Sequence, residues 1–78
     1  MTISAAQCRA ARALLAITQE QLAKRSGVSQ RSIANFELEK STPYRANLTV
    51  LRMTFEQLGV EFLDYDGVRR NPKAATKQ

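Results

Sequence analysis

Apolar residues recur along most of the chain at the three- and four-residue spacing of helices that bury one face. Four such segments can be separated, covering residues 4 to about 16, 18 to about 25, 30 to about 38, and 43 or 44 to 58. After Gly59 the pattern changes, because Val60, Phe62 and Val68 favour strands and residues 65–67 are typical of a turn. The pattern predicts a mainly α fold of four helices followed by a β-hairpin.

The first segment is rich in alanine. Ser4 and Gln7 match a capping box, in which the serine oxygen accepts an early backbone N–H and the glutamine reaches back. We expect a small buried residue at Cys8. The inner face that helical spacing predicts consists of Ala6, Ala10, Ala13, Leu14 and Ile17.

The second and third segments are short and are separated by a glycine. Thr18 and Gln21 match another capping box, and Gly27 suits the left-handed position beyond a helix end. Lys24 and Arg25 would lie in the last turn, as solvated charges or as weak contacts to an anionic partner. Ser29 is the expected N-cap of the third helix.

The third helix has two chemically different sides. At about 100° per residue, Ile33, Phe36 and Glu37 share the inner side. The outer side carries Gln30, Arg31 and Asn35, whose side chains suit multidentate hydrogen bonding, although an ordinary solvated helix face has the same composition.

The last segments complete the core and add strands. Leu48, Leu51, Phe55 and Leu58 form an apolar stripe on a helix that tolerates Pro43 in its first turn. Strands are expected over residues 60–64 and 68–70. An isolated hairpin is marginal in water, so this one must pack on the helices or pair with a second copy. Three of its side chains carry more apolar surface than a short hairpin buries, which makes them candidate dimer contacts: Phe62, Leu63 and Tyr65.

Length and charge limit the function. The 78 residues leave room for one small domain, which we divide into a helical part at 1–59, a hairpin at 60–70 and a disordered tail at 71–78. A formal charge of +5 favours an anionic partner, nucleic acid before an acidic membrane surface. The absence of long apolar runs and of a signal peptide predicts a soluble cytoplasmic protein.

Catalysis and metal binding are not expected. The sequence has no histidine, one cysteine, no nucleophile paired with a base and no glycine-rich phosphate loop. We therefore predict neither an enzyme nor a cofactor.

Residues 18–36 fit two helices joined by a tight turn, the helix-turn-helix pattern. In that arrangement the first helix crosses the DNA backbone, and the second enters the major groove with its N-terminal residues on base edges. Arginine can bind guanine and glutamine or asparagine can bind adenine, each with two hydrogen bonds. Gln30, Arg31 and Asn35 are thus candidate base contacts, and the helical part at 1–59 is the expected helix-turn-helix DNA-binding domain.

Over residues 9–58 the sequence resembles the lambda-repressor-like helix-turn-helix family, of Cro/cI or xenobiotic-response-element type. The resemblance rests on Thr18-Gln19-x-x-Leu22-Ala23, Gly27-Val28-Ser29, Ile33-x-x-Phe36-Glu37 and Pro43. It implies a recognition helix at 30–38, base contacts from Gln30, Arg31 and Asn35, and an ion pair between Arg12 and Glu37. It further implies DNA backbone contacts from Gln19, Ser32, Lys40, Ser41 and Arg45.

Two features depart from that family. Leu38-Glu39-Lys40 stands where the family often has glycine. Because left-handed geometry is costly for glutamate, we expect the third helix to run on or the loop to take another path. The hairpin also replaces the usual fifth helix, so the family's dimer contact does not transfer.

These observations predict a sequence-specific transcriptional regulator, such as a repressor, that binds double-stranded DNA as a homodimer on a palindromic operator. The alternative is an antitoxin-like or adaptor module whose hairpin edge receives a strand from a protein partner.

Overall fold

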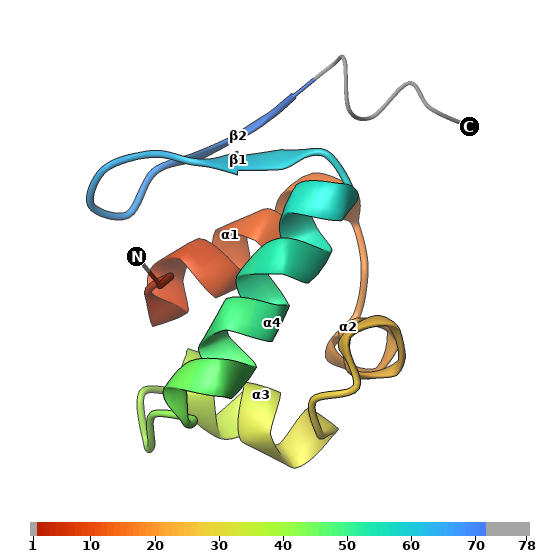
Figure 1. Ribbon diagram of the computed structural model, residues 1–78, viewed down its shortest axis with the longest axis vertical. Helices are drawn as coiled ribbons and strands as arrows, with labels where there is room; N and C mark the ends of the chain where they lie inside the picture. The colour runs from red at the N-terminus through yellow and green to blue at the C-terminus, as the bar shows by residue number, and fades with distance from the viewer. Residues whose placement is uncertain (1, 72–78) are drawn as a thin grey trace.

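The computed structural model describes residues 2–71. Within this range the chain forms four helices and a two-stranded sheet, as predicted. They are α1 (Ala5–Leu15), α2 (Gln19–Ser26), α3 (Gln30–Glu37), α4 (Arg45–Gln57), β1 (Val60–Phe62) and β2 (Val68–Arg70). The helix α3 lies at one end of the molecule and the hairpin at the other, with α1 and α4 between them (Figure 1).

The helix caps are those that the sequence predicts. Ser4 with Gln7 and Thr18 with Gln21 each form both hydrogen bonds of a capping box, and the Ser29 hydroxyl accepts the N–H of Ser32 at 3.1 Å. At α4 the prediction needs a correction. The backbone of Tyr44 is extended, with ψ at 151°, so the helix starts after it and Pro43 lies outside the first turn.

The predicted inner face of α1 is wrong. Ala13 is exposed, Ala6, Ala10 and Leu14 are only partly buried, and Ile17 lies beyond the helix end. The buried residues of this helix are Ala5, Gln7, Cys8 and Ala11. Both sets show helical spacing, and in an alanine-rich helix the side chains are too similar to distinguish one stripe from its neighbour. Cys8 is buried, as expected.

The core draws on every helix and on the first strand. Its largest fully buried side chains are those of Phe55, Leu22, Ile33, Leu51 and Cys8. The predicted stripe of α4 is confirmed at Leu48, Leu51 and Phe55, whereas Leu58 is only partly buried. Val60 is 2% exposed, so the hairpin shares the core of the helices.

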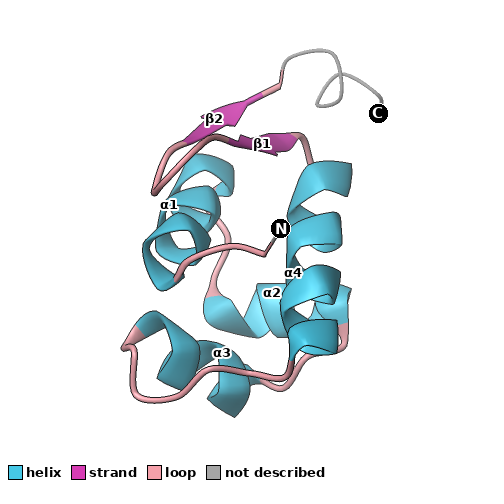
Figure 2. Ribbon diagram, turned by 60° about the vertical axis from the view of Figure 1, so that its left-hand side comes forward, coloured by secondary structure: helices cyan, strands magenta, loops and turns pink. Residues whose placement is uncertain are grey.

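The hairpin packs on α1 and α4 as a separate layer (Figure 2). Its strands are antiparallel, with Phe62 opposite Val68 and Glu61 opposite Arg69. The Phe62 ring meets the Phe55 ring edge-on with centroids 6.0 Å apart. Packing on the helices, one of the two expected ways to stabilise the hairpin, is thus present within a single copy.

The hairpin boundaries differ slightly from the prediction. The first strand ends at Phe62 because the N–H of Leu63 donates to the Gly67 carbonyl at 2.9 Å and closes the turn. At the other end the N–H of Asn71 donates to the Gly59 carbonyl at 2.6 Å and extends the pairing. Asn71, the first residue of the predicted disordered tail, thus continues the pairing of the hairpin; the remainder of that tail, residues 72–78, lies outside the described range.

Within residues 2–71, none of the helices has the length and hydropathy needed to cross a membrane.

Candidate nucleic-acid interface

A glycine turn sets the angle between α2 and α3. Gly27 has φ at 80°, and its N–H donates to the Ala23 carbonyl at 2.8 Å. A Cβ at this position would meet nothing within 4 Å, so glycine is required here by backbone conformation and not by space. Val28 then enters the core and Ser29 starts α3.

The helix α3 has the two faces that the sequence predicts. Ile33, Phe36 and Glu37 are buried, whereas Gln30 and Arg31 in the first turn are exposed. Ser32 and Asn35 are partly buried. The first turn of α3 thus presents a glutamine and an arginine to solvent, on a helix that two apolar side chains anchor in the core.

The carboxylate of Glu37 joins three helices. Its Oε2 accepts from Arg12 Nε at 2.7 Å and from Cys8 Sγ at 3.2 Å. Its Oε1 accepts from Arg12 Nη2 at 2.8 Å and from Gln19 Nε2 at 2.9 Å. We call Glu37, Arg12, Gln19 and Cys8 the Glu37 cluster. It ties α3 to α1 through Arg12 and Cys8, and to the first turn of α2 through Gln19.

Protonation in this cluster follows from burial and hydrogen bonding. Burial alone would raise the pKa of Glu37, but hydrogen bonds from Arg12, Gln19 and Cys8 together hold the pKa below its usual value. The hydrogen bond to Glu37 raises the pKa of Arg12. Burial, followed by the hydrogen bond to Glu37, raises the pKa of the Cys8 thiol. The thiol therefore stays protonated and acts as the donor.

Arginines extend the cluster to the backbone. Arg12 Nη1 donates to the Ile17 carbonyl at 3.0 Å, across the link between α1 and α2. The Arg9 guanidinium donates to the Glu37 carbonyl at the end of α3. The position of α3 is thus fixed at its C-terminal end by two arginines from α1.

The loop after α3 overturns the expectation about Glu39. This residue adopts the left-handed conformation, with φ at 60°, and α3 ends at Glu37 instead of running on. The N–H of Glu39 donates to the Phe36 carbonyl at 2.9 Å, and that of Lys40 donates to the Asn35 carbonyl at 2.8 Å. This pair of bonds is the Schellman turn that glycine usually completes, so its hydrogen bonds here offset the strain on glutamate.

The predicted backbone contacts lie on four separate segments, which are α2, α3, the loop after α3, and α4. Lys40 and Ser41 are exposed in the loop that follows α3, and Arg45 is exposed in the first turn of α4. Gln19 is partly buried, and one N–H of its amide already bonds Glu37. The N-terminal end of α4 lies at the same end of the molecule as α3 (Figure 1).

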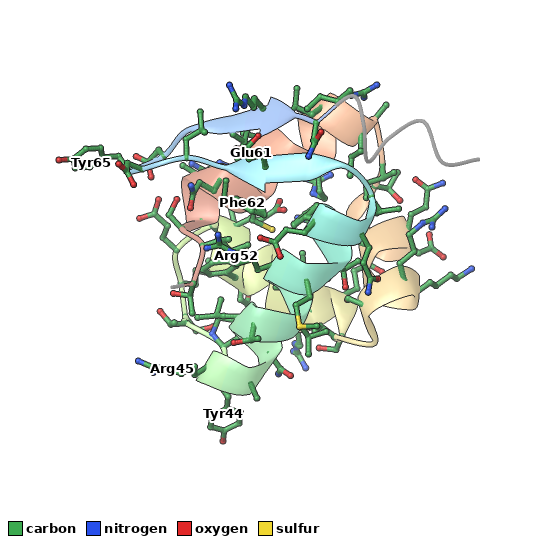
Figure 3. All side chains as sticks on the ribbon, turned by 45° about the horizontal axis from the view of Figure 1, so that its top comes forward. Tyr44, Arg45, Arg52, Glu61, Phe62 and Tyr65 are labelled. Atoms are coloured by element: carbon green, nitrogen blue, oxygen red, sulfur yellow. The ribbon has the colours of Figure 1, made fainter. Side chains whose placement is uncertain are left out.

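Sequence reasoning did not predict that Tyr44 would be exposed at the start of α4. Its side chain is 86% exposed, and Figure 3 shows it beside Arg45, projecting from the N-terminal end of α4. An aromatic residue is ordinarily assigned to a core, and only its place directly after Pro43 could have signalled a helix start. The roles of Cys8 and Arg9 in holding Glu37 were also missed, although Cys8 is one turn from Arg12.

Within the described range, no group of three or more His, Cys, Asp or Glu side chains is placed to hold a metal ion.

The comparison with known families agrees with this geometry. A family model described as Helix-turn-helix matches residues 9–52, which is more than half of the chain. The search of curated protein sequences found no match to this chain. The matched range begins at Arg9, includes the Glu37 cluster from Arg12 onward and contains α2 and α3 complete. The chain belongs to the Cro/cI-type helix-turn-helix family of DNA-binding regulators.

Proposed function

We propose that the protein is a sequence-specific transcriptional regulator that binds a partly palindromic DNA operator as a homodimer. The helix α3 lies in the major groove of each half-site. The exposure of Gln30 and Arg31 in the first turn of α3 carries this proposal, because residues at that place reach base edges when such a helix docks.

Base reading is assigned to three residues of α3. Arg31 suits the two acceptors of guanine, and Gln30 and Asn35 suit the acceptor and donor of adenine. Asn35 is partly buried and its carbonyl accepts from Lys40, but within residues 2–71 its side-chain amide has no hydrogen-bond partner and can therefore serve a base. The Glu37 cluster supports this role by holding α3 at one angle.

Phosphate contacts are assigned around α3. Lys40 and Arg45 supply positive charge, and Ser32 and Ser41 supply hydroxyl donors. Gln19 keeps one amide N–H for a phosphate while the other bonds Glu37. Such contacts position the protein without reading sequence.

Replacing Arg31 tests base reading. Arg31→Ala should weaken binding to the selected operator by about 1–3 kcal/mol and relax the preference at one base pair. The measurement is a gel-shift titration on an operator obtained by selection from random duplexes. Arg69→Ala, on the hairpin at the opposite end, is the matched control and should leave affinity unchanged. An equal loss on operator and random DNA for Arg31→Ala contradicts the role.

Replacing Lys40 tests phosphate contact. Lys40→Ala should weaken operator and random DNA alike and reduce the slope of log affinity against log salt by about one. Binding isotherms at several salt concentrations give the slope. A sequence-dependent loss with an unchanged slope would assign Lys40 to bases instead.

The antitoxin-like or adaptor function is the second candidate. It is favoured by the exposed apolar residues at the hairpin, Leu63 and Tyr65. Purification of the protein with a bound partner, lost on Leu63→Lys, together with no affinity for duplex DNA, would replace the first proposal with this one.

A further inference from the structure

A large apolar side chain lies on the outer side of α3. Leu38, the C-cap residue, is 66% exposed. At about 100° per residue, its direction from the helix axis differs by about 20° from that of Arg31 and by about 60° from that of Asn35. It differs by about 140° from that of the buried Ile33. Leu38 therefore belongs to the same side of α3 as two of the residues assigned to bases.

The backbone around Leu38 is fixed in position. Its N–H donates to the Ala34 carbonyl at 3.1 Å, which continues the hydrogen-bond pattern of the helix. The Schellman turn closes the helix directly after it. The Arg9 guanidinium donates to the carbonyl of Glu37, the residue before it. The exposed side chain thus projects from a helix end that α1 and the turn hold in place.

The other residues on this side of α3 make an apolar side chain conspicuous. Among the described residues of α3 and its C-cap, Leu38 is the large apolar residue that is exposed, whereas Ile33 and Phe36 are buried. A single exposed leucine needs no explanation on an ordinary surface. This one lies beside residues assigned to base edges, on the helix that is proposed to enter the major groove. An apolar partner in that groove is therefore the relevant candidate.

Thymine carries such an apolar group. Each base pair presents its own pattern of donors and acceptors in the major groove, and thymine adds its C5 methyl. Apolar side chains distinguish thymine by contact with this methyl. The amino group of cytosine at the same place would lose water without gaining a partner, because leucine has neither donor nor acceptor. A leucine at a base edge thus favours thymine.

The charges near Leu38 allow the approach of DNA. The acidic neighbour is Glu39, whose carboxylate lies 3.9 Å from the Arg9 guanidinium, so that its charge is compensated within the chain. Lys40 follows with a positive charge, and Arg31 lies two turns earlier on the same side of the helix. Three cations around one carboxylate leave this end of α3 attractive to phosphate.

We propose that Leu38 reads the methyl group of a thymine in each half-site. This inference rests on the proposed function, in which α3 lies in the major groove. Leu38 is seven residues beyond Arg31, about 10 Å along the helix axis. At about 3.4 Å per base pair, its thymine lies up to about three base pairs from the base that Arg31 reads. The contact adds an operator position that the hydrogen-bonding residues do not specify.

Deoxyuridine tests the contact because it lacks only the methyl group of thymidine. The operator is selected from random duplexes, and each thymine of one half-site is then replaced in turn. Gel-shift titration of the full chain should find a position where the replacement weakens binding about fourfold, the usual effect of burying one methyl group.

Substitutions of Leu38 connect that position to this side chain. Leu38→Ala should bind the thymine and deoxyuridine operators equally at that position and respond like the parent at all other thymines. Leu38→Met keeps an apolar side chain of similar volume and should keep the response. Leu63→Ala is the matched control, the same substitution on the hairpin at the opposite end, and should also keep it. Because Leu38 is exposed, the circular dichroism of Leu38→Ala should match that of the parent.

The outcomes separate this inference from the proposed function. The role of Leu38 is overturned, with the proposed function intact, if the parent prefers an operator through Arg31 but no thymine changes its response in Leu38→Ala. A loss of affinity in Leu38→Ala that is equal on thymine and deoxyuridine operators at every position assigns Leu38 to the sugar–phosphate backbone or to a protein contact, and also overturns the role. If the selection enriches no sequence, the proposed function fails and this inference fails with it.

Discussion

At the scale of single residues, Glu37 determines how α1, α2 and α3 meet. Its side chain is 4% exposed, and both carboxylate oxygens accept two hydrogen bonds each. A buried carboxylate is costly unless it is paired, and here Arg12 supplies the opposite charge with two bonds. The remaining two donors, Gln19 and Cys8, satisfy the acceptor positions that Arg12 does not reach.

Removing the charge of Glu37 should be strongly destabilising. Glu37→Gln leaves the partly buried Arg12 without its counter-ion, and we expect a loss of about 3 kcal/mol in the free energy of unfolding. Urea denaturation measures it. Glu56→Gln, which breaks the surface pair with Arg52, is the control and should cost less than about 1 kcal/mol. Equal losses in the two variants would show that the cluster adds nothing beyond a surface pair.

The same residue makes stability depend on pH. The pKa of Glu37 is lower in the folded protein than its usual value, so the ionised form is favoured by folding. Its contribution is fully present above the unfolded pKa of about 4.3 and is lost as pH falls through the folded pKa. The parent should therefore lose more stability than Glu37→Gln on acidification below about pH 4.3, as measured by denaturation at a series of pH values. Parallel pH profiles would contradict this.

Two non-glycine residues end helices in the left-handed conformation. Ala16 follows α1 with φ at 55° and Glu39 follows α3 with φ at 60°. Glycine carries no Cβ penalty there, so Ala16→Gly and Glu39→Gly should each stabilise the fold by about 1 kcal/mol. Thermal unfolding measures the gain. Glu39→Ala keeps the strain, and if it stabilises as much as Glu39→Gly, the explanation is wrong.

At the scale of elements, one glutamine joins the start of α1 to the hairpin turn. Gln7 Nε2 donates to the Leu63 and Gly67 carbonyls at 3.0 and 2.9 Å, while its Oε1 accepts the Ser4 N–H. The Ser4 hydroxyl in turn bonds the Asp66 carboxylate at 2.8 Å. The same capping box thus begins a helix and holds the turn of a hairpin that is more than fifty residues away.

Gln7→Ala should loosen the hairpin. The two carbonyls lose their shared donor, so we expect about 1–3 kcal/mol of destabilisation and faster amide exchange in the hairpin. Hydrogen exchange measured residue by residue reports both the loss of stability and the faster exchange in the hairpin. Gln21→Ala is the control, because Gln21 occupies the same place in the capping box of α2 and is exposed. Equal effects of the two substitutions on the hairpin amides would contradict the link.

The elements differ in how well sequence predicts them. A helix cap depends on residues that are close together in the sequence. Three helix starts could therefore be predicted, at Ser4, Thr18 and Ser29. Which stripe of α1 is buried depends on its neighbours, and alanine spacing could not show that. The conformation of the loop after α3 was also mispredicted. The prediction counted the energetic cost of a left-handed Glu39 but not the two backbone hydrogen bonds that offset this cost.

At the scale of the whole molecule, the end that carries α3 and the end that carries the hairpin are opposite each other and share one core. The helix-turn-helix pattern was predictable, since its glycine, caps and apolar spacing lie within one short segment. The hydrogen bond between Gln19 and Glu37 could not be predicted, because it depends on how α2 and α3 pack. Nor was the exposure of Tyr44, which follows from the turn of the chain after Pro43.

The burial of Cys8 gives the protein an internal reporter. The sequence contains one thiol, it is fully buried, and it lies where α1 meets α3. A thiol reagent can reach it only when these helices separate, so the labelling rate under native conditions measures the free energy of that opening. Bound DNA should slow the labelling in proportion to its saturation, which would report occupancy of the protein without a fluorescent tag.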